Sequence, residues 1–293
     1  MDSRQSEEQN KLIKTRLDEE TGFDLNRKNF NQNRSLLHGT QIGVNLMRIA
    51  IFSDIHGNDL AFEKVEADIK LQGADQIVCL GDAIQGGAQP AAVVQRLRQL
   101  NCPVVMGNAD AWMLTGVETA DEGIPPERKK KMEEIRQWSL SQLTEDGRAF
   151  IANFRPMITI QLEKNLDLLC FHASPANFDD VILPACPEDE FQKLLGAYQG
   201  KILTGGHTHA QQVRRLGRHF FFNPGSVGFA YAHFQPDGQF HADAWAEYAI
   251  LTFENGQSSL EFRKIPFDAN ELIQIYRQSG RPLTDEAIAQ YQR

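Results

Sequence analysis

Two histidines stand two residues apart in the segment Gly205-Gly206-His207-Thr208-His209. Imidazole is a common ligand for divalent metal ions. The glycines before the pair permit a tight turn, so both side chains can face the same small volume. Because a His-x-His pair often occurs by chance, the pair alone only raises the hypothesis of a metal site. The hypothesis gains weight if other residues of ligand type fall in equivalent places along the chain.

Four polar clusters upstream do so, because each follows a short apolar run that is typical of a buried strand. They are Asp54 and His56 after residues 49–53, Asp82 after 76–80, Asn108 after 103–106, and His172 after 166–171. In an open α/β sheet the carboxyl ends of the strands form the ligand crevice. We therefore expect all five clusters to meet at one edge.

The composition of this set indicates the chemistry. Seven side chains of the types Asp, Asn and His are too many for one four-coordinate ion. They suit two ions if one carboxylate bridges, which gives four protein ligands to each. Two-metal sites serve phosphate-ester hydrolysis by fixing a water, lowering its pKa and neutralising the phosphate oxygens.

The same residues, in this order, resemble the motifs of the calcineurin-like metallophosphoesterase superfamily: D-x-H, G-D, G-N-x-[DE], H and G-H-x-H. The resemblance covers about residues 47–264 and is closest to the YfcE-like phosphodiesterase group. It implies an α/β (α+β) fold, a two-sheet β-sandwich flanked by helices. The ligand sets that it implies are Asp54, His56, Asp82 and His209 for one metal, and Asp82, Asn108, His172 and His207 for the other, with Asp82 bridging.

The function that the resemblance implies is a dinuclear phosphoesterase. It would hydrolyse phosphodiester or phosphomonoester bonds through a metal-bridging hydroxide, with Asp82, Asn108 and His172 in the catalytic centre. We expect Mn²⁺ first, with Fe, Zn²⁺, Ni²⁺ or Co²⁺ as alternatives, since ligand type does not separate them. Alternative functions are a protein Ser/Thr phosphatase, a dinucleoside polyphosphate hydrolase, or a binding scaffold that keeps the fold without catalysis.

One position departs from the superfamily pattern. Many members have a histidine where this chain has Ala109, and that histidine helps to protonate the leaving group. Ala109 has no proton to donate, which makes the source of the leaving-group proton an open question and counts against a protein phosphatase. Asp110 beside it, and Asn58 at the start of the first helix, are candidate substrate contacts, with a helix cap as the alternative role of Asn58.

The charge and composition of the chain limit the kinds of partner that we expect. The 293-residue chain has a formal net charge of −9, which disfavours nonspecific nucleic-acid binding. Its four cysteines lack metal-type spacing, and we find no secretory signal and no apolar run long enough to span a bilayer. We expect a cytoplasmic enzyme that binds a small-molecule or nucleotide-like phosphoester, without a nucleic-acid or membrane partner, and with a homo-oligomer as an open alternative.

The pattern of apolar and polar runs divides the chain. Residues 1–46 are polar and predict a disordered extension, or an upstream segment before a natural start at Met47. The metallophosphoesterase domain is expected at 47–266, with a helical cap inserted at about 117–154, and residues 267–293 predict a C-terminal helix and tail.

Within the domain, alternating strands and helices at the start predict a mainly parallel, right-handed sheet, and later strands predict a second sheet with antiparallel pairs. Strands are expected at 49–53, 76–80, 103–106, 157–162, 166–171, 201–204, 220–222, 248–253 and 260–264, and helices at 59–71, 90–100, within 125–154 and at 270–280.

Overall fold

The computed structural model describes residues 46–117, 124–236, 238 and 240–292. All of them belong to one compact unit, Gly43–Arg293. The predicted disorder of residues 1–46 lies outside the described residues except at Leu46, which begins the first strand. Among the described helices, none has both the length and the apolar character needed to cross a membrane.

The first sheet has the strand order β2-β1-β8-β9. Its members are β1 (Leu46–Phe52), β2 (Gln76–Cys79), β8 (Trp245–Glu254) and β9 (Gln257–Pro266). The chain crosses from β1 to its parallel neighbour β2 through helix α2 (Asp59–Gln72), whereas β8 runs antiparallel to β1 with Ile49 opposite Leu251. A hairpin joins β8 to β9, and Asn255 and Gly256 both have positive φ angles in its turn.

The second sheet has the order β3-β4-β5-β7-β6. Its members are β3 (Ile158–Glu163), β4 (Leu166–Cys170), β5 (Ile202–Thr204), β6 (Gln212–Leu216) and β7 (His219–Asn223). The three central strands are parallel and the two outer ones antiparallel to their neighbours. Strand β6 was not predicted, because its short sequence has no continuous apolar run. It buries alternate residues, while Val213 and Arg215 between them are exposed.

Two strand predictions are wrong in detail. The first sheet is mixed rather than mainly parallel, because the late hairpin β8–β9 adds two antiparallel strands beside β1. Residues 103–106 form only isolated bridges, Cys79 with Val104 and Val105 with Arg155. The ladder stops there because the chain turns at Gly107 into helix α4 (Asn108–Thr115).

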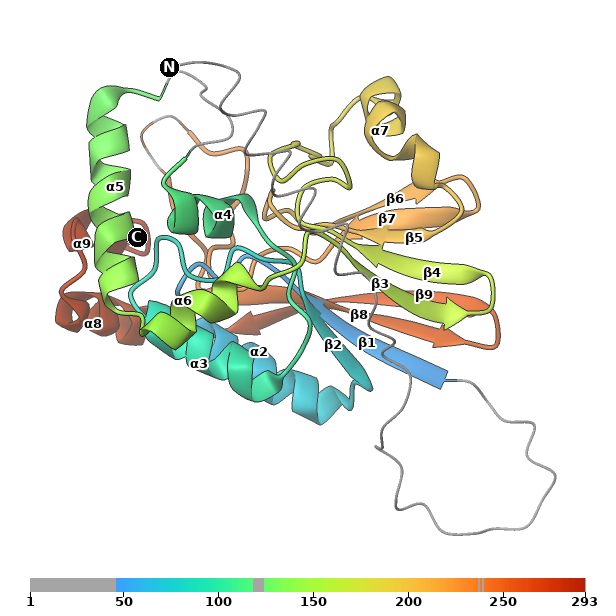
Figure 1. Ribbon diagram of the computed structural model, residues 1–293, viewed down its shortest axis with the longest axis horizontal. Coiled ribbons are helices and arrows are strands. Elements are labelled where there is room, and N and C mark those ends of the chain that lie inside the picture. The colour runs from blue at the N-terminus through green and yellow to red at the C-terminus, as the bar shows by residue number, and fades with distance from the viewer. Residues whose placement is uncertain (1–45, 118–123, 237, 239, 293) are drawn as a thin grey trace, which may run out of the picture. The chain divides into compact units, whose positions relative to one another are not determined.

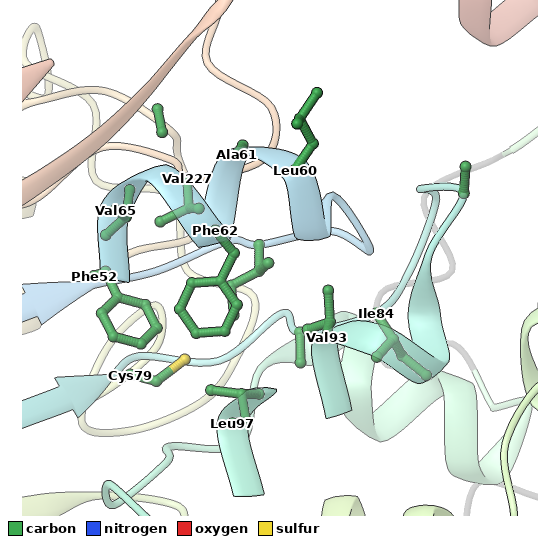
Figure 2. Close-up of a cluster of buried hydrophobic side chains, with 14 of the residues drawn as sticks. Phe52, Leu60, Ala61, Phe62, Val65, Cys79, Ile84, Val93, Leu97 and Val227 are labelled. Atoms are coloured by element: carbon green, nitrogen blue, oxygen red, sulfur yellow. The ribbon is translucent and has the colours of Figure 1, made fainter. Parts of the chain in front are cut away.

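The two sheets pack face to face around an apolar core that includes Ile51, Leu168 and Leu251. A second core lies on the other face of the first sheet, where α2 and α3 (Pro90–Leu100) cover it (Figure 1). Figure 2 shows its centre, where Phe52 from β1 and Phe62 from α2 pack with ring centroids 5.0 Å apart. Helix α7 (Glu188–Leu195), also not predicted, buries Phe191 against the outer face of the second sheet.

The remaining helices come from the predicted cap region and from the C-terminal region. Two of them, α5 (Pro126–Ser141) and α6 (Glu145–Ala152), come from the predicted cap region, of which residues 118–123 lie outside the described part. The C-terminal region holds two helices, α8 (Ala269–Ser279) and α9 (Thr284–Ala289), where one was predicted. They bury Leu272, Tyr276 and Ile288 in the same core as α2.

Candidate metal centre

The seven predicted ligand side chains meet at the carboxyl ends of the strands. Six of them form two groups whose ligand atoms lie within 4.8 Å of one another, namely Asp54, His56 and His209, and Asp82, His172 and His207. Asn108 joins the second group, because its Oδ1 lies 3.0 Å from Nε2 of His172. The convergence expected from the strand pattern is therefore observed.

The two histidines of the first group face each other through their Nε2 atoms, which lie 3.0 Å apart. Each ring places its Nδ1 against a backbone carbonyl, His56 on Gln85 at 2.9 Å and His209 on Phe229 at 2.7 Å. A carbonyl only accepts, so in the neutral rings both Nδ1 atoms carry the proton and both Nε2 atoms present lone pairs. Two facing lone pairs repel unless a cation lies between them, and this arrangement therefore fits a metal ion.

Asp54 places a carboxylate oxygen that lacks a hydrogen-bond partner beside the two facing Nε2 atoms. Its Oδ2 accepts a hydrogen bond from the backbone N–H of His207 at 3.0 Å. Its Oδ1 is buried and has no hydrogen-bond partner among the described residues, although it lies 3.3 Å from Nε2 of His209 and 3.7 Å from Nε2 of His56. Leaving a buried charged oxygen unpaired is costly, so the chemistry of this donor set fits a bound cation.

The second group repeats this construction. His172 places Nδ1 2.8 Å from the carbonyl of Leu80, which directs Nε2 to Oδ1 of Asn108, 3.0 Å away, and to Oδ2 of Asp82, 3.5 Å away. The ring of His207 lies edge-on to His172, with centroids 5.2 Å apart. Backbone carbonyls that fix the tautomer of a histidine are typical of metal sites.

Asp82 lies between the two groups. Its Oδ1 accepts from the backbone N–H of Ala109 at 3.0 Å. Its Oδ2 lies 3.5 Å from Nε2 of His172 and 3.8 Å from Nε2 of His56. One carboxylate oxygen therefore faces both histidine clusters, which is the placement a bridging ligand needs.

The pKa values of the four histidines are shifted in different directions. Burial alone would lower the pKa of His172, but the neighbouring Asp82 outweighs it and raises this pKa to about 10. Asp54 raises the pKa of His209 against the same effect of burial. The pKa values of His56 and His207 are lowered, first by burial and then by the neighbouring histidines.

The loops that carry these ligands have an unusual backbone. Five of the seven have positive φ angles between 47° and 66°, namely Asp54, His56, Asp82, His207 and His209. This region is uncommon for residues with a Cβ and costs of order 1 kcal/mol each. Such strain concentrates at functional sites, and here it turns five side chains toward one place. No feature of the sequence had indicated it.

Two glycines permit the close approach of the loops. A Cβ on Gly107 would lie 2.0 Å from Oδ1 of Asp82, and one on Gly206 would lie 1.9 Å from the hydroxyl of Ser53. Side chains at either position would displace Asp82 or the segment of Asp54. The G-N and G-H-x-H motifs therefore need their glycines for packing as well as for turning.

The two candidate substrate residues are occupied by other contacts. Asp110 is fully buried and accepts hydrogen bonds from the backbone N–H groups of Asp82 and Ala83 at 2.7 and 2.9 Å. Burial, with the charge of Asp82, raises its pKa to about 7. Asn58 caps α2 by accepting from the N–H of Ala61 at 3.1 Å, and donates to the carbonyl of Gly228. Both placements favour support of the loops over contact with substrate.

A later segment also supports the ligand loops. Asn223 donates through its amide nitrogen to the carbonyl of Gly206 at 2.6 Å and to the hydroxyl of Thr208 at 3.1 Å. Ser226 donates to the backbone carbonyl of Asp54 at 2.8 Å. These contacts hold the loop with the two C-terminal histidine ligands against the first loop.

The ligands open into a cavity of about 840 Å³. One side is aromatic, with Phe229 and Tyr231 beside the ring of His209. Another side is formed by the cap helix α5 and by the C-terminal helices, including Arg281 and Glu286. The contribution of the C-terminal helices was not predicted, because nothing in their sequence carries a ligand pattern.

Comparison with known proteins agrees with this geometry. A family model of the calcineurin-like phosphoesterase superfamily domain matches residues 47–255. The chain belongs to this superfamily. A superfamily of this type generally binds two divalent metals, and the present member has two candidate groups of ligands for them.

Individual relatives give less detail. An uncharacterized protein of Methanocaldococcus jannaschii is 29% identical over 197 residues, which is 61% of this chain and 76% of that protein. A metallophosphoesterase from Sphaerobacter thermophilus has a similar structure, with a TM-score of 0.58 at 23% identity, over 83% of this chain and 98% of that one. A hypothetical protein of Pyrococcus horikoshii OT3 reaches a TM-score of 0.65 at 19% identity, over 84% and 98%. The two structures establish the shared fold, which is the predicted sandwich of two sheets flanked by helices.

Proposed function

We propose that this member of the superfamily is a metal-dependent hydrolase of phosphodiesters, and of phosphomonoesters as a second class. The observation that carries the proposal is the position of Asp82, whose Oδ2 faces the histidine Nε2 atoms of both groups. A single carboxylate with imidazoles on both sides suits two neighbouring ions, which is the arrangement that phosphoester hydrolysis uses.

Each ion has its own protein ligands in this proposal. One would be held by Asp54, His56 and His209, and the other by Asn108, His172 and His207, with Asp82 shared. When bound, the ions supply Lewis-acid activation of the phosphoester and of the attacking water. Mn²⁺ is the ion we propose first, since carboxylate and amide oxygens together with imidazoles accept it.

The chain itself orients these groups before any ion binds. Backbone carbonyls of Leu80, Gln85 and Phe229 fix the rings of His172, His56 and His209. Because the rings are already oriented, binding loses little side-chain entropy.

Metal content and turnover together test the proposal. Protein purified and reloaded with Mn²⁺, Zn²⁺, Fe²⁺, Co²⁺ or Ni²⁺ is assayed with bis-p-nitrophenyl phosphate and p-nitrophenyl phosphate. We expect about two metals per chain and turnover that a chelator abolishes and metal restores. The variant His209→Ala identifies contaminating activity, because it must lose turnover.

The opposite result would favour a different class of protein. A chain that binds no metal and hydrolyses neither ester would be a scaffold that keeps the fold for binding. The protein could instead bind metal, hydrolyse neither ester, and hydrolyse phosphopeptides or dinucleoside polyphosphates. That result would replace the proposed substrate class with the class that is hydrolysed.

A further inference from the structure

One side of the cavity is built by residues that follow the superfamily domain in the sequence. The family model ends at residue 255, whereas Tyr276, Arg281, Leu283 and Glu286 all line the cavity beside the metal ligands. The cavity of about 840 Å³ is far larger than one phosphate and is of the size that holds a whole small molecule. The C-terminal helices therefore contact whatever part of a substrate extends away from the metals.

Arg281 is the notable residue on this side. Its guanidinium donates to the carbonyl of Gly86 at 2.7 Å and to those of Pro282 and Leu283 at 2.8 and 3.2 Å. Gly86 lies next to Gln85, whose carbonyl orients the metal ligand His56. The guanidinium is thus held rigidly at the edge of the metal site.

Arg281 has no carboxylate partner within ion-pair distance among the described residues. Backbone carbonyls supply partial charges only, and loss of hydration lowers the pKa of Arg281. A partly buried guanidinium normally pairs with an anion. Glu286 is the carboxylate whose charge reaches Arg281, but its own ion pair is with Lys131.

The backbone around Arg281 is strained. Leu283 has a φ of 57°, which is uncommon for a side chain of this kind. That conformation separates α8 from α9 by an abrupt turn, and it turns the carbonyl of Leu283 toward the guanidinium. Strain of this kind persists where the surroundings fix it and often marks a ligand-binding segment.

The other charges around the cavity leave room for an anion. Glu286 pairs with Lys131 of the cap helix at 2.6 Å, so these two charges balance each other. Arg128 of the same helix adds another cation, and the cavity is also lined by the acidic residues Asp82 and Asp179. Arg281 and Arg128 therefore supply the positive charge on the side formed by the helices.

We propose that Arg281 forms an anion subsite beside the metal centre, and that the substrate is a phosphoester with a second anionic group, a phosphate or a carboxylate. The inference rests on the proposed function and specifies its substrate class. The scissile phosphate binds at the metal ligands, while the second group accepts hydrogen bonds from Nη2 of Arg281, the guanidinium nitrogen for which the described residues provide no acceptor. Arg128 adds long-range attraction from the cap helix.

A matched pair of esters tests the subsite. Thymidine 5′-(p-nitrophenyl phosphate) is compared with the same molecule bearing a 3′-phosphate, and with a 3′-O-carboxymethyl analogue, all releasing p-nitrophenol. The protein carries Arg281→Gln, which keeps an amide donor for Gly86, or the control Arg277→Gln at an exposed position of α8. We expect the 3′-phosphate to lower KM roughly tenfold or more in the unaltered protein, and Arg281→Gln to abolish that difference.

The comparison separates a subsite from a structural role. If Arg281 only anchors the loop of Gly86, Arg281→Gln lowers kcat for all three esters equally and the subsite is refuted. Equal KM values for the three esters in the unaltered protein also refute it. A gain with the carboxymethyl ester and none with the 3′-phosphate assigns the subsite to carboxylates.

A binding measurement keeps the test independent of hydrolysis. Calorimetry compares thymidine 3′,5′-bisphosphate with thymidine 5′-monophosphate on the metal-loaded protein. Tighter binding of the bisphosphate that disappears in Arg281→Gln supports the subsite even when no ester is hydrolysed, in which case only the proposed function fails. Equal binding of the two nucleotides overturns a subsite for phosphate, whether or not the protein is an enzyme.

Discussion

The carboxylate of Asp110 lies directly behind Asp82, with its Oδ2 2.7 Å from the backbone nitrogen of Asp82. The same carboxylate accepts from the N–H groups of Ala83 and Gly107 at 2.9 and 3.2 Å. It therefore ties the loop after β2, which carries Asp82, to the start of α4, where Asn108 is the first residue. Asp110 is a positioning residue for both metal groups.

The variant Asp110→Asn tests this role. An amide has only one acceptor oxygen, so at least one buried N–H loses its partner, at a cost of about 1–3 kcal/mol. We expect a lower free energy of unfolding in urea. We also expect weaker retention of the metal ion that the group of Asn108 and His172 would hold. The control Asp189→Asn changes an exposed residue of α7, far from the ligand loops in sequence, and should leave both quantities nearly unchanged. Equal stability and metal content in the two variants would contradict the role.

The two groups of ligands should lose their ions separately. We expect His56→Ala to leave about one metal per chain, because the group of Asn108 and His172 is intact, and His207→Ala to do the same for the opposite group. Asp82→Asn should weaken both ions, because its Oδ2 faces both groups. Elemental analysis after dialysis measures this, with His241→Ala as an exposed control. Loss of both ions from each single histidine variant would show one cooperative site instead.

Metal binding should release a proton. With its pKa raised to about 10, His172 is protonated in the apo protein at pH 7, and a metal can bind its Nε2 only after that proton leaves. Affinity for the metal should therefore rise with pH between about 6 and 8, by about tenfold per unit for one proton. Calorimetry in buffers of different ionisation enthalpy counts the protons. An affinity that does not change with pH would show that His172 is neutral before the metal arrives.

A network away from the site should control acid stability. Asp68 on α2 accepts hydrogen bonds from Arg263 at 2.6 Å and from Tyr248 at 2.5 Å. Burial alone would raise the pKa of Asp68, but these bonds outweigh it and hold the pKa below its usual value. A carboxyl with a lowered pKa in the folded state stabilises it above the unfolded pKa of about 4, and loses that contribution as the pH falls through the folded value.

The variant Asp68→Asn measures that contribution. We expect it to lower the free energy of unfolding by about 1–3 kcal/mol at pH 7, and the difference from the unaltered protein to shrink on acidification below about pH 4. Urea denaturation at several pH values measures it, with the exposed Glu163→Gln as control. A difference that is constant from pH 7 to pH 3 would mean that the charge of Asp68 is not responsible.

The dependence of the hydrolysis rate on the pKa of the leaving group should reflect the alanine at position 109. Ala109 lines the cavity and has no proton to donate, while the neighbouring Asp110 is turned away into the backbone amides. General acids contribute about 10²–10⁴-fold, so without one the rate should fall steeply as the pKa of the leaving group rises. A series of substituted phenyl diesters measures the slope. A flat dependence would reveal a proton donor in the complex with substrate.

The sequence alone indicated the candidate ligands and the family, because each motif is a short run of residues beside a strand end. Asp54 and His56 are two residues apart, as are His207 and His209, so their chemistry is visible without knowledge of the fold. The order of strands and helices around them was also largely predictable, since apolar periodicity is local. The mixed first sheet was not, because the position of β8 beside β1 depends on residues about 200 positions apart.

Only the tertiary structure decided what each polar side chain does. Asp110 and Asn58 were candidate substrate contacts in the sequence, yet backbone groups of other loops and helices take up their polar atoms. The position of Arg281 in the cavity depends on how α8 packs, and no motif marks it. The type of each ligand can be read from a single residue of the sequence. The direction of a side chain, its hydrogen-bond partners and the charges around it are set only when distant segments of the chain come together. Those properties therefore depend on the fold and cannot be derived from a motif.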